Sequence, residues 1–235
     1  MGAGGSGNDS QICGLRAACG EAVAGLAAAR PDLITVVGGA DHTAEYEAST
    51  AGTLRSFGVT FTIGSGEPVL PLSLTVGAWL LRRFLAADGA GMPPPAAIRD
   101  VNDVAVVPWL VRLQAVRQSL PTAACLRLGA ELAGRAPRVA LLVMGDGSAR
   151  KAAGVHGAAD PPAEEYDAAA AAALAAADAG ALARLDAALD DELMVAGRAA
   201  WQVLAGAAVG ARLRGQVRFA AAPLDVTYLV ASWAS

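Results

Sequence analysis

The residues best suited to chemistry follow an apolar run near the middle of the chain. The segment RVALLVM, from Arg138 to Met144, ends at Gly-Asp-Gly-Ser, which brings a carboxyl group at Asp146 close to a hydroxyl group at Ser148. A buried strand that stops at such residues typically delivers them to the mouth of an α/β fold. Asp146 and Ser148 are therefore candidate catalytic residues. The same side chains can instead cap a following helix, because both accept hydrogen bonds from free backbone N–H groups.

A second polar turn follows the apolar run LITVV, from Leu33 to Val37. This turn, GGADHT, carries Asp41 and His42, and an imidazole at such a place can bind a metal ion or transfer a proton. A loop histidine exposed to water is the simpler interpretation. The turn is not a dinucleotide-binding fingerprint, because it lacks the third glycine of that motif. Since loops that follow strands meet at one edge of an α/β sheet, the two turns are expected to form one cleft.

Histidine is scarce in this chain, which has only His42 and His156. A serine nucleophile at Ser148 needs a neighbouring base, and neither histidine lies in a nucleophile motif. His156 lies in the glycine-rich segment GVHGAADPP, which is typical of an exposed loop. The sequence by itself therefore favours ligand binding or helix capping at these turns over nucleophilic catalysis.

The composition of the chain indicates which kinds of partner it is not expected to bind. The net charge of −4 over 235 residues comes from scattered acids and arginines, so we expect neither a nucleic-acid partner nor a polybasic membrane patch. No segment approaches the roughly 20 apolar residues that span a bilayer, and the start of the chain does not resemble a secretory signal. The three cysteines lack CxxC spacing and are expected to behave as small buried hydrophobes. These features predict a cytoplasmic protein.

The segments around the polar turns alternate between helical and strand patterns. Glycine and serine dominate residues 1–11, which are expected to be disordered, and residues 12–235 are expected to form one domain. Helices are predicted from Ile12 to the ARPD segment, over Leu70–Phe84, from a cap at Thr122 toward Gly134, and over Glu164–Ala208 with breaks at Gly180 and near Asp190. Strands are predicted at Leu33–Val37, Gly58–Pro68, within Val101–Val111, at Arg138–Met144 and at Val226–Trp233. Strands separated by helices indicate an α/β fold with helices on both faces of a sheet.

Four segments carry a resemblance to a known family: ARPDLITVVGG, GEPVLPLSLTVGAWLL, RVALLVMGDGSAR and ELMVAGRAAWQVLAGAA. In order and spacing they resemble actinobacterial proteins with a LigB-like domain, the domain of the class III extradiol ring-cleavage dioxygenases. The likeness extends from the first helix to the final YLVASW. It implies a three-layer αβα sandwich around a central mixed sheet. The wider superfamily includes protocatechuate-type ring-opening dioxygenases and Memo-like proteins.

The resemblance also implies a metal site, and this chain departs from it. Active members hold a non-haem Fe(II) with two histidines and one glutamate, which leaves positions open for a catecholate and O₂. By position, His42 falls near the second of those histidines and Glu192 near the glutamate. The strand and His-Pro-Pro turn that carry the first histidine have no counterpart here, and Ala149 stands where the family has its acid/base histidine. Since alanine cannot transfer a proton, a loss of roughly 10²- to 10⁴-fold in rate is expected from that change alone.

Three hypotheses follow from these observations. The first is an active Fe(II) ring-opening dioxygenase in which His42, Glu192 and a folded-back His156 hold the metal. The second is a protein without ring-cleavage activity that binds a small aromatic or other organic ligand without metal, or acts as a scaffold, with a homodimer left open. The third is a truncated gene product whose missing first strand leaves sheet edges unpaired.

The second hypothesis assigns its polar contacts to Asp41, Asp146 and Ser148, which would line the retained cleft. It needs no metal ligand and no proton-transferring histidine. The sequence therefore favours it over the iron enzyme.

Overall fold

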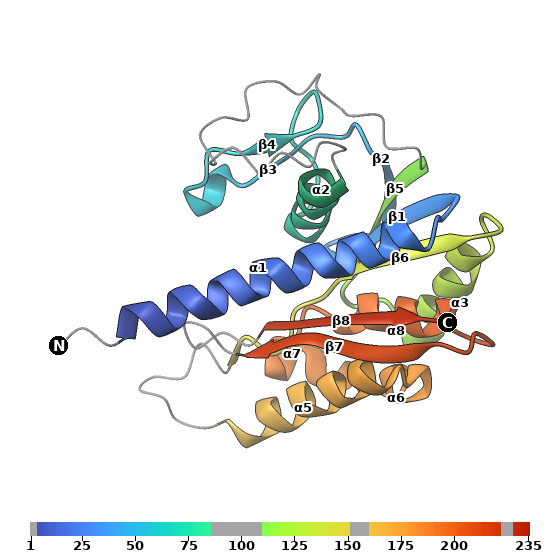
Figure 1. Cartoon of the computed structure of the whole chain (residues 1–235). Helices are drawn as coiled ribbons and strands as arrows, with labels where there is room; N and C mark the ends of the chain where they lie inside the picture. The colour runs from blue at the N-terminus through green and yellow to red at the C-terminus, as the bar shows by residue number, and fades with distance from the viewer. Residues whose placement is uncertain (1–3, 86–109, 151–159, 222–227) are drawn as a thin grey trace.

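The computed structural model describes residues 4–85, 110–150, 160–221 and 228–235 (Figure 1). The described chain has an α/β fold built around a mixed four-stranded sheet in the order β2-β5-β1-β6. These strands are β1 (Leu33–Ala40), β2 (Ala44–Glu47), β5 (Leu110–Arg117) and β6 (Val139–Met144). β1 is parallel to β5 and β6, whereas β2 is antiparallel to β5. The three parallel strands therefore end at the same edge of the sheet, where α/β proteins usually bind ligands.

Helices cover both faces of this sheet, as the sequence predicts. One face packs against α1 (Gly4–Ala28) and α2 (Leu72–Leu85). The other packs against α3 (Thr122–Ala133) and α8 (Arg198–Ala207). Figure 1 shows the resulting three-layer αβα arrangement, with α2 and α8 on opposite sides of β1 and β6.

The alternation of side chains along β1 explains why the sheet is covered on both faces. Ile34 and Val36 are buried in one hydrophobic cluster with Leu74 of α2, and Val37 is buried in another with Val203 of α8. Successive residues of a strand point to opposite faces, so a continuous apolar run is typical of a strand that is buried on both. The prediction of a buried strand at Leu33–Val37 is confirmed.

An outer layer packs beside α8 and consists of helices and a β-hairpin. It contains α5 (Pro161–Ala176), α6 (Ala179–Ala183), η3 (Ala187–Leu189), α7 (Asp190–Leu193), β7 (Arg214–Ala221) and β8 (Tyr228–Ala234). β7 and β8 pair antiparallel and contact both α1 and α5 (Figure 1). The hairpin therefore joins the first helix of the chain to the outer layer.

A small irregular region precedes α2, and here the sequence prediction was wrong. It consists of β3 (Gly52–Thr53), η1 (Arg55–Phe57) and β4 (Thr62–Ile63), where we expected one strand over Gly58–Pro68. Three glycines with φ of 75°, 76° and 89°, at positions 58, 64 and 66, turn the chain before and after β4. The alternating apolar residues therefore reflect a short hairpin rather than a long strand.

Two helix starts also differ from the predictions. α1 begins at Gly4, so the expected disordered segment 1–11 is helical from that residue onward. Nucleation is the costly step of helix formation, so the packed turns around Val23 allow the helix to extend toward Gly4 although glycine is a weak helix former. α3 ends at Ala133 with Gly134 as its C-cap, in line with the prediction, but Thr122 is its first helical residue and Pro121 is its N-cap, with no side-chain capping bond.

Two further predictions hold only in part, and a third is confirmed. The strand expected within Val101–Val111 overlaps β5 at its last two positions, and residues 101–109 lie outside the described residues. The helix break expected at Gly180 occurs at Ala177, whose φ is 52°, because Asp178 caps α6 through the N–H of Ala181 at 2.8 Å. The break near Asp190 is confirmed, since α7 begins there.

The final strand lies where the sequence predicts it, as β8, and its partner β7 was not predicted. Among the helices that the structure describes, none is both long enough and apolar enough to cross a bilayer.

Candidate functional site

A pocket of about 550 Å³ opens at the edge of the sheet where β1, β5 and β6 end. The end of β1 and the turn after it line the pocket with residues 39–42, Gln118 follows β5, and residues 144–146 comprise the last residue of β6 and the start of its loop. Residues 68–73 and Val76 form the opposite wall at the start of α2, and Ala196 lies ahead of α8. Ligand pockets in proteins commonly measure about 300–1,000 Å³, so this one can hold a small molecule.

Both polar turns singled out from the sequence contribute to this pocket. Asp41 and His42 line it from β1, and Asp146 lines it from β6. The His42 ring is oriented from β2, because its Nε2 lies 2.9 Å from the hydroxyl oxygen of Tyr46. Within the described residues, neither Asp41 nor Asp146 has a hydrogen-bond or ion-pair partner for its carboxylate. The two carboxylates are therefore free to accept hydrogen bonds from a ligand.

Three glycines allow the backbone segments beneath the pocket to meet. A Cβ on Gly39 would lie 2.7 Å from the carbonyl oxygen of Ala196, and one on Gly197 would lie 2.6 Å from that of Asp146. A Cβ on Gly145 would lie 2.6 Å from Nε1 of Trp201. A side chain at any of these positions would push the ends of β1 and β6 away from the turn ahead of α8.

The opposite wall is mainly apolar and is fixed to the sheet by hydrogen bonds. The backbone N–H groups of Val69 and Leu70 both donate to the carbonyl oxygen of Ala51 at 3.0 Å. The hydroxyl of Ser73, in the first turn of α2, donates to the carbonyl oxygen of Gly39 at 2.8 Å. These bonds hold the PVLPL segment, residues 68–72, over the end of β1.

Sequence reasoning missed the contributions of Gln118, Ser73 and the 68–72 wall. Gln118 escaped notice because β5, the strand that leads to it, carries Arg112 and Gln114 within its apolar run. Gln114 is nevertheless buried, since its side-chain amide donates to the carbonyl oxygen of Ala44 at 3.1 Å. The two prolines of residues 68–72, just before a helix, were the available signal for a rigid wall.

Ser148 does not line the pocket, although it follows Asp146 by two residues. Its hydroxyl donates to the carbonyl oxygen of Leu193 and accepts from the N–H of Arg150 at 3.2 Å. Its own N–H donates to Oδ1 of Asp167 at 2.8 Å. The bond from Arg150 has the form of a helix cap, and the others tie this loop to α5 and α7. Ser148 therefore holds the loop in place.

Glu192 also lies away from the pocket. It is exposed on α7, and its carbonyl oxygen accepts a hydrogen bond from Arg150 at 3.3 Å. His156 lies outside the described residues. Across the part of the chain that the structure describes, no three His, Cys, Asp or Glu side chains are grouped so as to hold a metal ion. An iron facial triad needs three protein ligands, so the described residues do not fit the Fe(II) that the family resemblance implies.

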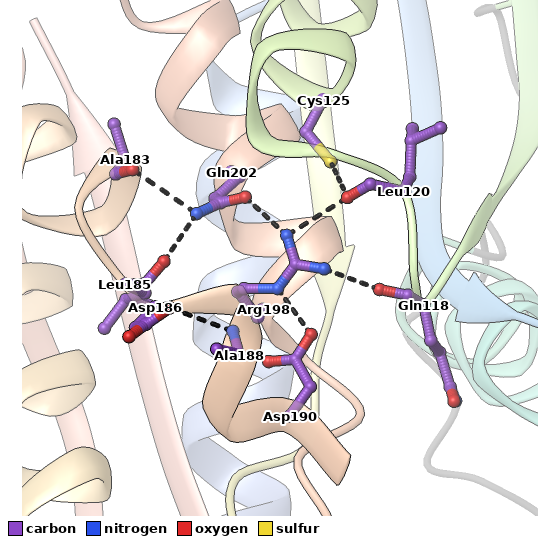
Figure 2. Close-up of polar contacts among 10 residues, drawn as sticks. All are labelled: Gln118, Leu120, Cys125, Ala183, Leu185, Asp186, Ala188, Asp190, Arg198 and Gln202. Carbon is purple, nitrogen blue, oxygen red and sulfur yellow. Dashed lines mark hydrogen bonds and ion pairs between the residues drawn. The ribbon is translucent and has the colours of Figure 1, made fainter.

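A buried arginine makes several polar contacts with the loop after β5, one residue of which lines the pocket (Figure 2). The side chain of Arg198 is 1% exposed and forms an ion pair with Asp190. Its two terminal nitrogens donate to the carbonyl oxygen of Gln118 at 2.7 Å, to that of Leu120 at 3.1 Å and to Oε1 of Gln202 at 2.7 Å. Arg198 thereby fixes the loop after β5, in which Gln118 lines the pocket, against the start of α8.

Burial changes the pKa values of two ionisable groups near Arg198. Burial raises the pKa of Asp190, and the hydrogen bond and charge of Arg198 oppose that rise. Burial, together with the charge of Asp190, raises the pKa of the Tyr166 hydroxyl above its ordinary value near 10. The Tyr166 oxygen and Oδ1 of Asp190 are both buried, and neither has a hydrogen-bond partner among the residues that the structure describes. Tyr166 therefore stays a neutral phenol and is no candidate base.

No protein-family model matches this chain, and no curated protein matches it either. The pocket itself therefore supplies the argument for function. It joins Asp41, His42 and Asp146, whereas Ser148 and Glu192 lie elsewhere in the fold.

Proposed function

We propose that this chain binds a small organic ligand, without a metal ion, in the pocket at the ends of β1, β5 and β6. The observation that carries the proposal is the meeting of Asp41, His42 and Asp146 in one pocket opposite an apolar wall. Binding sites for small molecules combine a mainly apolar lining with a few polar groups that orient the ligand. Carboxylates that have no protein partner among the described residues are suited to that orienting role.

We further propose that the chain is a LigB-like protein without ring-cleavage activity. The resemblance of its four segments supports the family, and the αβα layers agree with the fold that the family implies. Two features argue against ring cleavage. Ala149 stands in the place of the acid/base histidine, and Glu192 does not line the pocket that His42 lines. A small aromatic molecule would suit both the resemblance and the apolar wall.

A ligand screen by thermal unfolding tests the binding proposal. We expect some small organic compounds to raise the melting temperature equally with and without a chelator. Asp146→Ala should reduce that shift, and Glu192→Ala should leave it unchanged because Glu192 is exposed outside the pocket. Shifts that survive in Asp146→Ala would place the ligand elsewhere, and shifts abolished by the chelator would contradict a metal-free site.

Metal analysis tests the iron alternative directly. After anaerobic incubation with Fe(II) and desalting, we expect less than about a tenth of an equivalent of iron to remain, since catalytic sites bind metal tightly enough to survive that step. Retention near one equivalent in the wild type, lost in His42→Ala, would restore the dioxygenase hypothesis.

A further inference from the structure

We draw no further inference here: the strongest candidate, the outer edge of β6, which is apolar and pairs only with β1 among the strands that the structure describes, carries nothing because no described residue shows what covers that edge.

Discussion

A charged side chain in a protein interior is stable only when its partners surround it, and Arg198 illustrates this at the scale of one residue. Replacing it with methionine keeps much of the volume and removes the ion pair to Asp190 along with the bonds to two backbone carbonyls. Breaking a buried ion pair from one side typically costs about 3–5 kcal/mol. We expect a loss of that size in the free energy of unfolding of Arg198→Met, measured by urea denaturation.

A surface arginine provides the matched control. Arg138 is 59% exposed and pairs with Asp32, and exposed ion pairs are usually worth about 0–1 kcal/mol. Arg138→Met should therefore cost far less than Arg198→Met. Arg198→Lys should not restore stability, because an ammonium group cannot reproduce the planar fork that reaches Gln118 and Leu120 at once. Similar losses in the buried and surface variants would contradict this account.

Ser148 and Asp146 offer a contrast between a structural and a binding role. Ser148→Ala removes a hydrogen bond to Leu193, so we expect a loss of about 1–3 kcal/mol in the free energy of unfolding, with ligand affinity unchanged. Asp146→Ala should lower ligand affinity and leave the free energy of unfolding unchanged, since Asp146 is exposed and lines the pocket. Denaturation and titration of the same two variants make the comparison. A loss of ligand affinity in Ser148→Ala would give its hydroxyl a place in the site.

At the scale of elements, a pair of residues joins the beginnings of β1 and β6. Arg138 donates to both carboxylate oxygens of Asp32, at 2.8 and 3.3 Å, and this bonding holds the pKa of Asp32 below its ordinary value of 3.8. A carboxyl group whose pKa is lower in the folded state contributes stability above its unfolded pKa and loses it as the pH falls through the folded pKa.

The contribution of this pair should therefore depend on pH in a defined direction. We expect Asp32→Asn to be less stable than the wild type at pH 6 by a small amount, because the pair is exposed to solvent. The difference should shrink as the pH falls below about 4, where this carboxyl group becomes protonated in the unfolded wild type, and should be lost below the lower pKa of the folded state. Urea denaturation of both proteins across this range measures the difference. A gap that widens toward acid pH would contradict the assignment.

The elements that the sequence predicted well are those whose burial is uniform. β1 and β6 read as apolar runs because helices cover both faces of the sheet, and α2 shows a helical pattern of leucines. β5 is also central, but Gln114 is buried there, where its amide donates to the distant carbonyl group of Ala44 as well as to that of Ala115. A tertiary hydrogen bond of this kind leaves no local pattern. The same reasoning applies to β7, which is stabilised by pairing with β8.

The sequence predicted which strand ends meet at the site, but it did not predict the other residues that line the pocket. The rule that parallel strands deliver their following loops to one edge correctly brought Asp41, His42 and Asp146 together. It could not decide the direction of Ser148, which turns away because Leu193 and Asp167 bind it. It also could not supply the wall at residues 68–72, since that segment is held in place by bonds to Ala51 and by the bond from Ser73 to Gly39 of β1.

At the scale of the whole molecule, α8 connects the sheet to the outer layer of helices. Its residues Ala199 and Val203 pack in the cluster beneath the sheet, while Trp201 and Ala205 pack in the cluster of the outer helices. Opposite sides of this helix are therefore buried against different layers. Since neither cluster is complete without α8, we expect the sheet and the outer layer to unfold together.

Trp233 tests that cooperativity from the far end of the chain. It lies on β8, packs with the outer cluster, and its Nε1–H donates to the carbonyl oxygen of Leu174 at 2.6 Å. Trp233→Phe should cost about 1 kcal/mol for the lost hydrogen bond, and Trp233→Ala about 3 kcal/mol or more for the lost packing. Tyr228→Ala, at the exposed end of the same strand, should cost less.

In every variant, far-ultraviolet circular dichroism and tryptophan fluorescence should report one common unfolding transition. If the two signals separated in Trp233→Ala, the hairpin layer would be unfolding independently of the sheet, and α8 would not couple the layers as its packing indicates.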